Sequence, residues 1–138
     1  MAEQATILVV DDDRDFVNIT RMILESQHYQ VITAANGEQG LTVMRREKPD
    51  LVILDIMMSY IMDGLDVRRK MAEDSALQHI PVIMVTSLTS TRSQGEMPAH
   101  DYIPDSQWLN KPIDPDLLLE RVRTLLGRDQ GTGNTAIG

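Results

Sequence analysis

Short apolar runs alternate along the chain with longer stretches in which apolar residues recur every three or four positions. The short runs are Thr6–Val10, Tyr29–Ala34, Leu51–Leu54, Pro81–Val85 and Gln107–Asn110. Runs of this length predict strands, and the longer periodic stretches predict amphipathic helices. The third run is apolar without interruption, which is typical of a strand covered on both faces. The pattern therefore predicts five strands with helices between them.

The periodic stretches also predict which residues each helix turns toward the core. The first helix follows the first strand, and its inward face should carry Phe16, Ile19, Thr20, Ile23 and Leu24. The second helix opens at Asn36-Gly37-Glu38, turns Leu41 and Met44 inward, and stops at Pro49.

A third helix starts at Asp63-Gly64 and runs through Val67 and Met71. The final helix has Asp114 as its N-cap and Pro115 at its first position, which are the residue types preferred there. Its apolar positions recur at helical spacing and are Leu118, Val122, Leu125 and Leu126.

Two segments depart from this alternation. Ser87–Ser106 contains Gly95, Pro98 and Pro104 and few apolar residues, so we expect the fourth helix to be short or irregular. Gly127 is expected to end the final helix, and residues 128–138 are polar and glycine-rich. We therefore expect one domain over residues 1–127, followed by a flexible tail or linker.

Strands separated by helices of roughly ten to fifteen residues imply right-handed crossovers and a parallel sheet. The predicted fold class is α/β: a doubly wound, five-stranded parallel sheet flanked by helices on both faces. A chain of 138 residues is one domain by length, and it is large enough to bury a substantial core.

Composition limits the classes of function. The formal charge of −8 and the scattered basic residues argue against a nucleic-acid-binding face. The chain has no cysteine, which removes disulfides, thiolate metal sites and cysteine nucleophiles and fits a reducing cytoplasm, where we expect the protein to lie. Its acidic start is unlike a signal peptide, and no apolar stretch approaches a membrane span, so we expect no membrane association.

Acidic residues follow two of the predicted strands directly. The first strand runs into Asp11-Asp12-Asp13, and the third runs into Asp55. Ligand sites in open parallel sheets lie beyond the carboxyl ends of the strands, so these carboxylates should meet at one edge. Carboxylates that converge without His or Cys favour a hard cation such as Mg²⁺. For Asp13 we favour the simpler role of a helix N-cap.

Two further residues complete a candidate phosphoryl site at the same edge. Thr86 ends the fourth apolar run, and Lys111 follows the fifth strand immediately before Pro112. A carboxylate nucleophile, a divalent cation, a hydroxyl donor and an ammonium are the groups needed to receive a phosphoryl group. The sequence therefore predicts phosphoryl chemistry on one of the aspartates.

Four segments in this order resemble the response-regulator receiver domains of two-component signalling. They are Ile7–Asp13, Leu51–Met58, Val82–Ser87 and Asn110–Pro112, and the resemblance runs from about Thr6 to Leu126. It implies a flavodoxin-like fold similar to that of the chemotaxis regulators. It also implies that the chain is a phosphoacceptor, which assists its own phosphoryl transfer and dephosphorylation, and not an enzyme.

The resemblance assigns a role to each matching residue. Asp55 would accept the phosphoryl group, Asp12 would bind Mg²⁺ directly and Asp11 would hold a water of the metal. The backbone carbonyl of Met57 would be another ligand. Thr86 and Lys111 would contact the phosphoryl group, and Trp108 stands at the position of the aromatic that reports phosphorylation by turning inward.

The implied partners are a sensor histidine kinase or a phosphotransfer protein as the donor and an unidentified output protein. Homodimerisation on phosphorylation and a place in a phosphorelay are also consistent with the family. The chain is either a stand-alone regulator or a receiver within a longer protein.

Three features depart from the family pattern. The loop Met58–Gly64 is one residue longer than usual and lacks the usual proline, and Trp108 replaces the more common Tyr or Phe. The segment Ser87–Ser106 matches the usual fourth helix poorly.

These departures keep open a receiver-like module that binds partners without being phosphorylated. A second alternative is a Mg²⁺-dependent phosphatase or phosphotransferase acting on small molecules, although no insertion is large enough to supply a substrate cap. A dinucleotide-binding fold is excluded, because no Gly-x-Gly-x-x-Gly follows the first strand.

Overall fold

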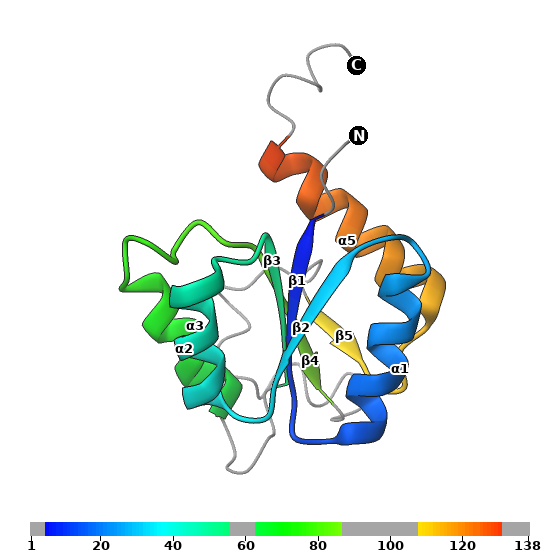
Figure 1. Ribbon diagram of the computed structural model, residues 1–138, viewed down its shortest axis with the longest axis horizontal. Helices are drawn as coiled ribbons and strands as arrows, with labels where there is room; N and C mark the ends of the chain where they lie inside the picture. The colour runs from blue at the N-terminus through cyan, green and yellow to red at the C-terminus, as the bar shows by residue number, and fades with distance from the viewer. Residues whose placement is uncertain (1–4, 56–62, 87–107, 131–138) are drawn as a thin grey trace.

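Five parallel strands form a single sheet at the centre of the protein. The computed structural model describes residues 5–55, 63–86 and 108–130. The strands lie in the order β2-β1-β3-β4-β5, with the carboxyl ends toward the lower edge in Figure 1. Their bounds are β1 Thr6–Val10, β2 Gln30–Ala34, β3 Leu51–Asp55, β4 Val82–Thr86 and β5 Trp108–Asn110. The predicted parallel α/β sheet is confirmed.

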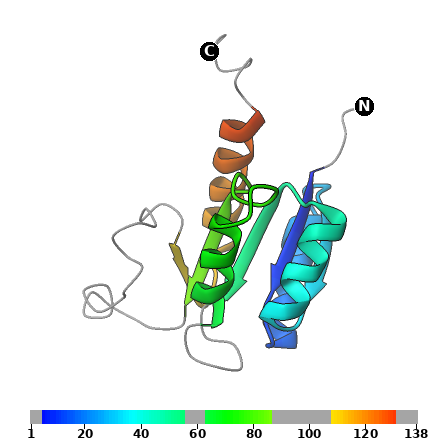
Figure 2. The ribbon, with the colours of Figure 1, turned by 90° about the vertical axis from the view of Figure 1, so that its left-hand side faces the viewer.

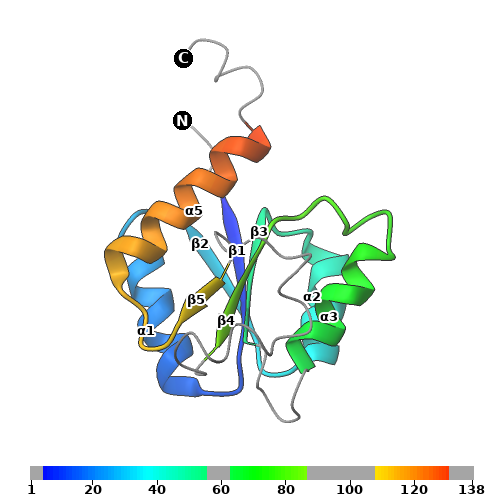
Figure 3. The ribbon, with the colours of Figure 1, turned by 180° about the vertical axis from the view of Figure 1, so that it is seen from behind.

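The described helices cover both faces of the sheet. Figures 1 and 3 show α1 and α5 on one face and α2 and α3 on the other, and Figure 2 shows the second pair from the front. Their bounds are α1 Arg14–Glu25, α2 Gly37–Glu47, α3 Asp63–Ala72 and α5 Pro115–Gln130. The fourth helix expected over 87–106 lies outside the described residues. None of these helices is long and apolar enough to cross a membrane.

The side chains of each strand alternate between two apolar clusters, one on either face of the sheet. In β1, Leu8 and Val10 pack toward α2 and α3, whereas Ile7 and Val9 pack with Leu118 and Val122 of α5. All five residues of β3 are buried. Because β1 and β3 are covered on both faces and paired on both edges, their carboxyl ends are held firmly in place.

Polar side chains fix the starts of the helices. Asp13 caps α1, because its carboxylate accepts the backbone N–H groups of Asp15 and Phe16, as the sequence predicted. Asn36 caps α2 by accepting the N–H of Gln39. Asp114 accepts the N–H of Asp116 at 3.0 Å, at the start of α5.

Two details of the sequence prediction are wrong. Ile19 is 57% exposed, because successive helix residues are about 100° apart and it lies about 140° around the axis from the buried Leu24. Gly127 does not end α5, which continues to Gln130. Since no described glycine has a positive φ, Gly127 lacks the left-handed conformation with which glycine usually terminates a helix. The boundary expected after residue 127 thus falls inside α5.

Gly40 of α2 lies against Val10 of β1, and this contact yields a test of the packing. A Cβ at position 40 would lie 3.0 Å from Cγ2 of Val10, which is fully buried in the sheet. We expect Gly40→Ala to lower the free energy of unfolding by about 1 kcal/mol, because overpacking outweighs the better helix propensity of alanine. Urea unfolding measures the change.

The matched control is Gly127→Ala in α5, where an added Cβ meets no atom within 4 Å. This substitution should stabilise the protein by up to about 1 kcal/mol. In a Val10→Ala background, Gly40→Ala should become stabilising as well. A destabilisation that persists without the valine methyl groups would contradict the packing explanation.

Candidate functional site

Three aspartates meet at the carboxyl edge of the sheet. Asp11 and Asp12 follow β1, and Asp55 is the last residue of the neighbouring β3. Carboxylate oxygens from all three lie within 4.8 Å of one another. Asp11 and Asp55 are buried, with 2% and 4% of their surface exposed, whereas Asp12 is exposed. The parallel pairing of Val10 with Leu54 places the residues after them side by side, as the sequence predicted.

The two oxygens of Asp11 have different surroundings. Oδ1 accepts the backbone N–H of Asp13 at 2.9 Å, which ties Asp11 to the start of α1. Oδ2 is buried, and its partner among the described residues is the Lys111 ammonium at 3.0 Å. Carboxylate oxygens can accept from more than one partner, so Oδ2 could contact a metal cation as well as the lysine.

Lys111 supplies the positive charge at the site. Its Nζ lies 3.0 Å from Oδ2 of Asp11 and 3.4 Å from Oδ2 of Asp55. Its backbone N–H donates to the carbonyl of Thr86 at 2.8 Å. The lysine side chain is 19% exposed, so the ion pairs are only weakly screened by water.

The proximity of these groups shifts two pKa values. Burial raises the pKa of Asp11 from 3.8 to about 6, while the Asp13 N–H and Lys111 oppose the shift and the charge of Asp55 adds to it. For Lys111, burial acts to lower the pKa, but the hydrogen bonds and charges of Asp11 and Asp55 outweigh it, and the net pKa is raised. The lysine is therefore an ammonium at neutral pH.

Thr86 and Trp108, the other expected site residues in the described chain, lie on neighbouring strands. Thr86 is buried at the end of β4 and pairs with Asn110 of β5. Trp108 is half-buried against the cluster beneath α2 and α3, and its carbonyl accepts Nη1 of Arg121 at 3.2 Å. Met57, expected as a ligand, and residues 58–62 of the loop Met58–Gly64 lie outside the described residues.

Sequence reasoning missed two features beside the aspartates. The ring of Phe16, expected only as a core residue, lies 4.4 Å from Nζ of Lys111. A cavity of about 340 Å³ adjoins Asp11 and has Arg14 and Arg21 of α1 and Thr33 of β2 among its lining residues. The spacing of the two arginines, two helical turns apart, was the available sign that they share a side of α1.

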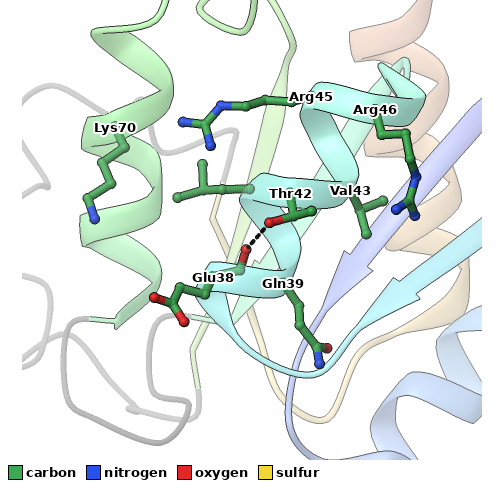
Figure 4. Close-up of a pocket in the computed structure, with 8 residues that line it drawn as sticks. Glu38, Gln39, Thr42, Val43, Arg45, Arg46 and Lys70 are labelled. Atoms are coloured by element: carbon green, nitrogen blue, oxygen red, sulfur yellow. Dashed lines mark hydrogen bonds between the residues drawn. The ribbon is translucent and has the colours of Figure 1, made fainter.

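A second concavity, of about 620 Å³, lies against α2 and α3 and away from the aspartates. In Figure 4, Arg45 extends from α2 toward α3, where Lys70 lies, and Thr42 donates to the carbonyl of Glu38 at 3.1 Å. Arg45 also pairs with Asp74 at 3.4 Å. This concavity holds mixed, exposed charges, so the groups suited to chemistry remain those at the sheet edge.

The chemistry of the three aspartates fits a site for a hard cation. All the donor atoms are carboxylate oxygens, which Mg²⁺ and Ca²⁺ prefer, and no thiolate is available for softer metals. Such an aspartate triad is typical of Mg²⁺-binding sites in phosphoryl transfer.

Comparisons with known proteins agree with this geometry. The chain is 41% identical over 124 residues to the response regulator PleD of Caulobacter vibrioides, covering 88% of this chain and 26% of that protein. It is 38% identical over 136 residues to the probable transcriptional regulator ycf27 of Porphyridium aerugineum, covering 96% and 52%. The chain thus spans between about a quarter and about half of the length of these relatives.

Solved structures share the fold. A putative response regulator from Chloroflexus aurantiacus J-10-fl superposes with a TM-score of 0.80 at 27% identity, covering 91% of this chain and all of that one. A CheY-like receiver domain protein from Methanospirillum hungatei JF-1 gives 0.79 at 27% identity, covering 95% and 100%.

A family model described as the response regulator receiver domain matches residues 7–123, a range that includes the aspartates, Lys111 and the described strands except for Thr6, the first residue of β1. The sheet order, the three aspartates and Lys111 are therefore those of a shared fold with a shared site, and the chain belongs to the response regulator receiver domain family of two-component signalling.

Proposed function

We propose that this receiver domain accepts a phosphoryl group on Asp55 in a Mg²⁺-dependent reaction. The observation that carries the proposal is the position of Asp55, a buried carboxylate beside two other aspartates and 3.4 Å from the Lys111 ammonium. A carboxylate beside both a lysine ammonium and a site for a metal cation has the groups needed for phosphoryl transfer.

In the proposed reaction, a carboxylate oxygen of Asp55 attacks the phosphorus of a phosphohistidine on the donor protein. An O–P bond forms to Asp55 and the P–N bond breaks, with its electron pair passing to the imidazole nitrogen. Lys111 offsets negative charge on the phosphoryl oxygens, and the Thr86 hydroxyl donates a hydrogen bond to one of them.

Asp11, Asp12 and Asp55 would hold the cation, and the backbone carbonyl of Met57 is the further ligand expected from the family. When bound, Mg²⁺ offsets charge on the phosphoryl oxygens. Asp11 would then have a second positive partner besides Lys111, which opposes the effect of burial on its pKa.

The donor in this proposal is a sensor histidine kinase or a phosphotransfer protein. Phosphorylation would shift an equilibrium between two conformations and so change a protein-binding surface, with Trp108 as the switch aromatic. The output protein is unidentified, and a homodimer formed on phosphorylation is one candidate form of output. We place the protein in the cytoplasm. Because α5 continues to Gln130, we place the linker or tail after that helix and not after residue 127. Receiver domains are not classed as enzymes.

The first test is intact mass after incubation with Mg²⁺ and acetyl phosphate. We expect one phosphoryl adduct, on Asp55, because this buried carboxylate lies beside the cation site and the Lys111 ammonium and stands at the position of the family's phosphoacceptor. Asp55→Asn should abolish the adduct, because its amide is not a nucleophile. Asp66→Asn on α3, an exposed carboxylate paired only with Arg69 in the described structure, should retain it.

An adduct that persists in Asp55→Asn would move the acceptor to another residue. No adduct in the wild type, together with unchanged Trp108 fluorescence on addition of beryllofluoride, would favour the alternative of a receiver-like interaction module that is not phosphorylated.

The raised pKa of Asp11 predicts how stability depends on pH without metal. Between pH values of about 4 and 6 the folded protein keeps a proton that the unfolded chain has released, so ionising Asp11 above this range costs folding free energy. Asp11→Asn removes that cost. We expect its stability relative to wild type to rise from about pH 4 to about pH 7 by at most about 3 kcal/mol.

Chemical unfolding in EDTA at a series of pH values measures this difference. The raised pKa of Lys111 affects stability only in the alkaline range and leaves the comparison intact. Mg²⁺ stabilises the protein because it binds only the folded site. At neutral pH it should stabilise the wild type more than Asp11→Asn, because the variant lacks one of the carboxylates of that site. A relative stability that is constant with pH would contradict the burial of an ionisable Asp11.

A further inference from the structure

Among the described residues, the Lys111 ammonium lies close to two carboxylates and to one group that is not a carboxylate. That group is the ring of Phe16 on α1, whose centroid lies 4.4 Å from Nζ. This distance is well inside the range of about 6 Å over which an aromatic face attracts a cation. Because the lysine side chain is only 19% exposed, the ring occupies space that water would otherwise fill.

Hydrogen bonds fix the backbone at both ends of this contact. The N–H of Phe16 donates to Oδ1 of Asp13 at 3.3 Å, within the cap of α1. The N–H of Asp13 in turn donates to Oδ1 of Asp11 at 2.9 Å. On the other side, the N–H of Lys111 donates to the Thr86 carbonyl at 2.8 Å. The ring and the start of the lysine side chain therefore have defined places.

The rest of the lysine side chain needs an additional constraint. Four side-chain carbons joined by rotatable bonds separate its backbone from Nζ. The ammonium is a point charge without directional preference between acceptors. The two carboxylates attract it, but they are also the groups that a cation and a phosphoryl group would engage. An aliphatic residue at position 16 would fill space without attracting the charge, and a carboxylate would add to an already acidic site.

We infer that Phe16 is a positioning residue for phosphoryl transfer: its ring face holds the Lys111 ammonium in place above Asp11 and Asp55. This inference rests on the proposed function. Phe16 contacts neither the phosphoryl group nor the cation in this scheme, and it acts through the lysine. The ring keeps its attraction for the ammonium while the carboxylates change partners.

The composition of the chain permits a specific test, because Phe16 is its only phenylalanine. Replacing phenylalanine with 4-fluoro-, 3,5-difluoro- or 3,4,5-trifluorophenylalanine alters this single side chain. Each fluorine withdraws electron density from the ring face and changes the shape of the ring little. A role in packing alone would not follow the number of fluorines, whereas attraction for the ammonium would decrease with each one.

Two quantities are measured for each protein: the rate of Asp55 phosphorylation by acetyl phosphate with Mg²⁺, and the midpoint of urea unfolding in EDTA. We expect the rate to fall stepwise, reaching about two- to five-fold for the trifluoro ring, as a contact of this strength implies. The unfolding midpoint should fall in the same order. In a Lys111→Met background, which removes the charge and keeps an unbranched chain, the midpoint should no longer follow fluorine number.

The outcomes separate the inference from the proposed function. An unfolding midpoint that does not follow fluorine number, or that follows it equally in the Lys111→Met background, would contradict the attraction between the Phe16 ring and the ammonium. A graded midpoint with an ungraded phosphorylation rate would overturn the positioning role. A wild-type protein that gains no phosphoryl group while its midpoint remains graded would reject the proposed function and restrict Phe16 to holding Lys111 in the resting protein.

Discussion

Two buried carboxylates and one ammonium share the carboxyl edge of the sheet, and their charge balance limits what this edge can do. Asp11 and Asp55 lie on adjacent strands, and Lys111 lies within 3.4 Å of an oxygen of each. Two negative charges this close disfavour joint ionisation, and burial increases the cost. Burial, with a smaller contribution from the charge of Asp55, raises the pKa of Asp11 to about 6 even with the lysine present. With one ammonium for two carboxylates, the site favours binding of a further positive charge.

The surrounding structure holds this unfavourable arrangement in place. β1 and β3 are central strands, with apolar side chains packed on both faces. The cost of burying the aspartates is offset by the burial of these strands, which places their carboxyl ends side by side. Asp11 is also tied to the start of α1 through the N–H of Asp13. Stability in the core thus supports a locally costly group of charges, as is common at functional sites.

The sequence predicted those parts of the structure that depend on local pattern. Apolar runs that ended directly at Asp11 and Asp55 marked both strands and both carboxylates, and parallel pairing brought them together. Periodicity placed Ile19 inside, but it defines a face only approximately, and Ile19 lies at the margin of that face. The end of α5 was also missed, because a glycine terminates a helix only when it adopts a left-handed conformation.

Contacts between distant elements were the least predictable. Phe16 and Lys111 are far apart in the sequence, and each had a sufficient explanation alone, one as a core residue and the other as a site lysine. Their contact depends on how far the Lys111 side chain extends from the end of β5 toward α1, which no local pattern encodes. Arg14 and Arg21 were missed for the same reason, because their shared cavity is completed by β2.

The backbone hydrogen bond from Lys111 to Thr86 mechanically couples two side chains that differ in chemistry. The backbones that carry the Thr86 hydroxyl and the Lys111 ammonium are joined by this hydrogen bond, so a displacement of either backbone shifts the other or breaks the bond. The Lys111 amide proton therefore reports on the relative position of these two strands. Its exchange with solvent would register a movement at the sheet edge even where both side chains kept their contacts.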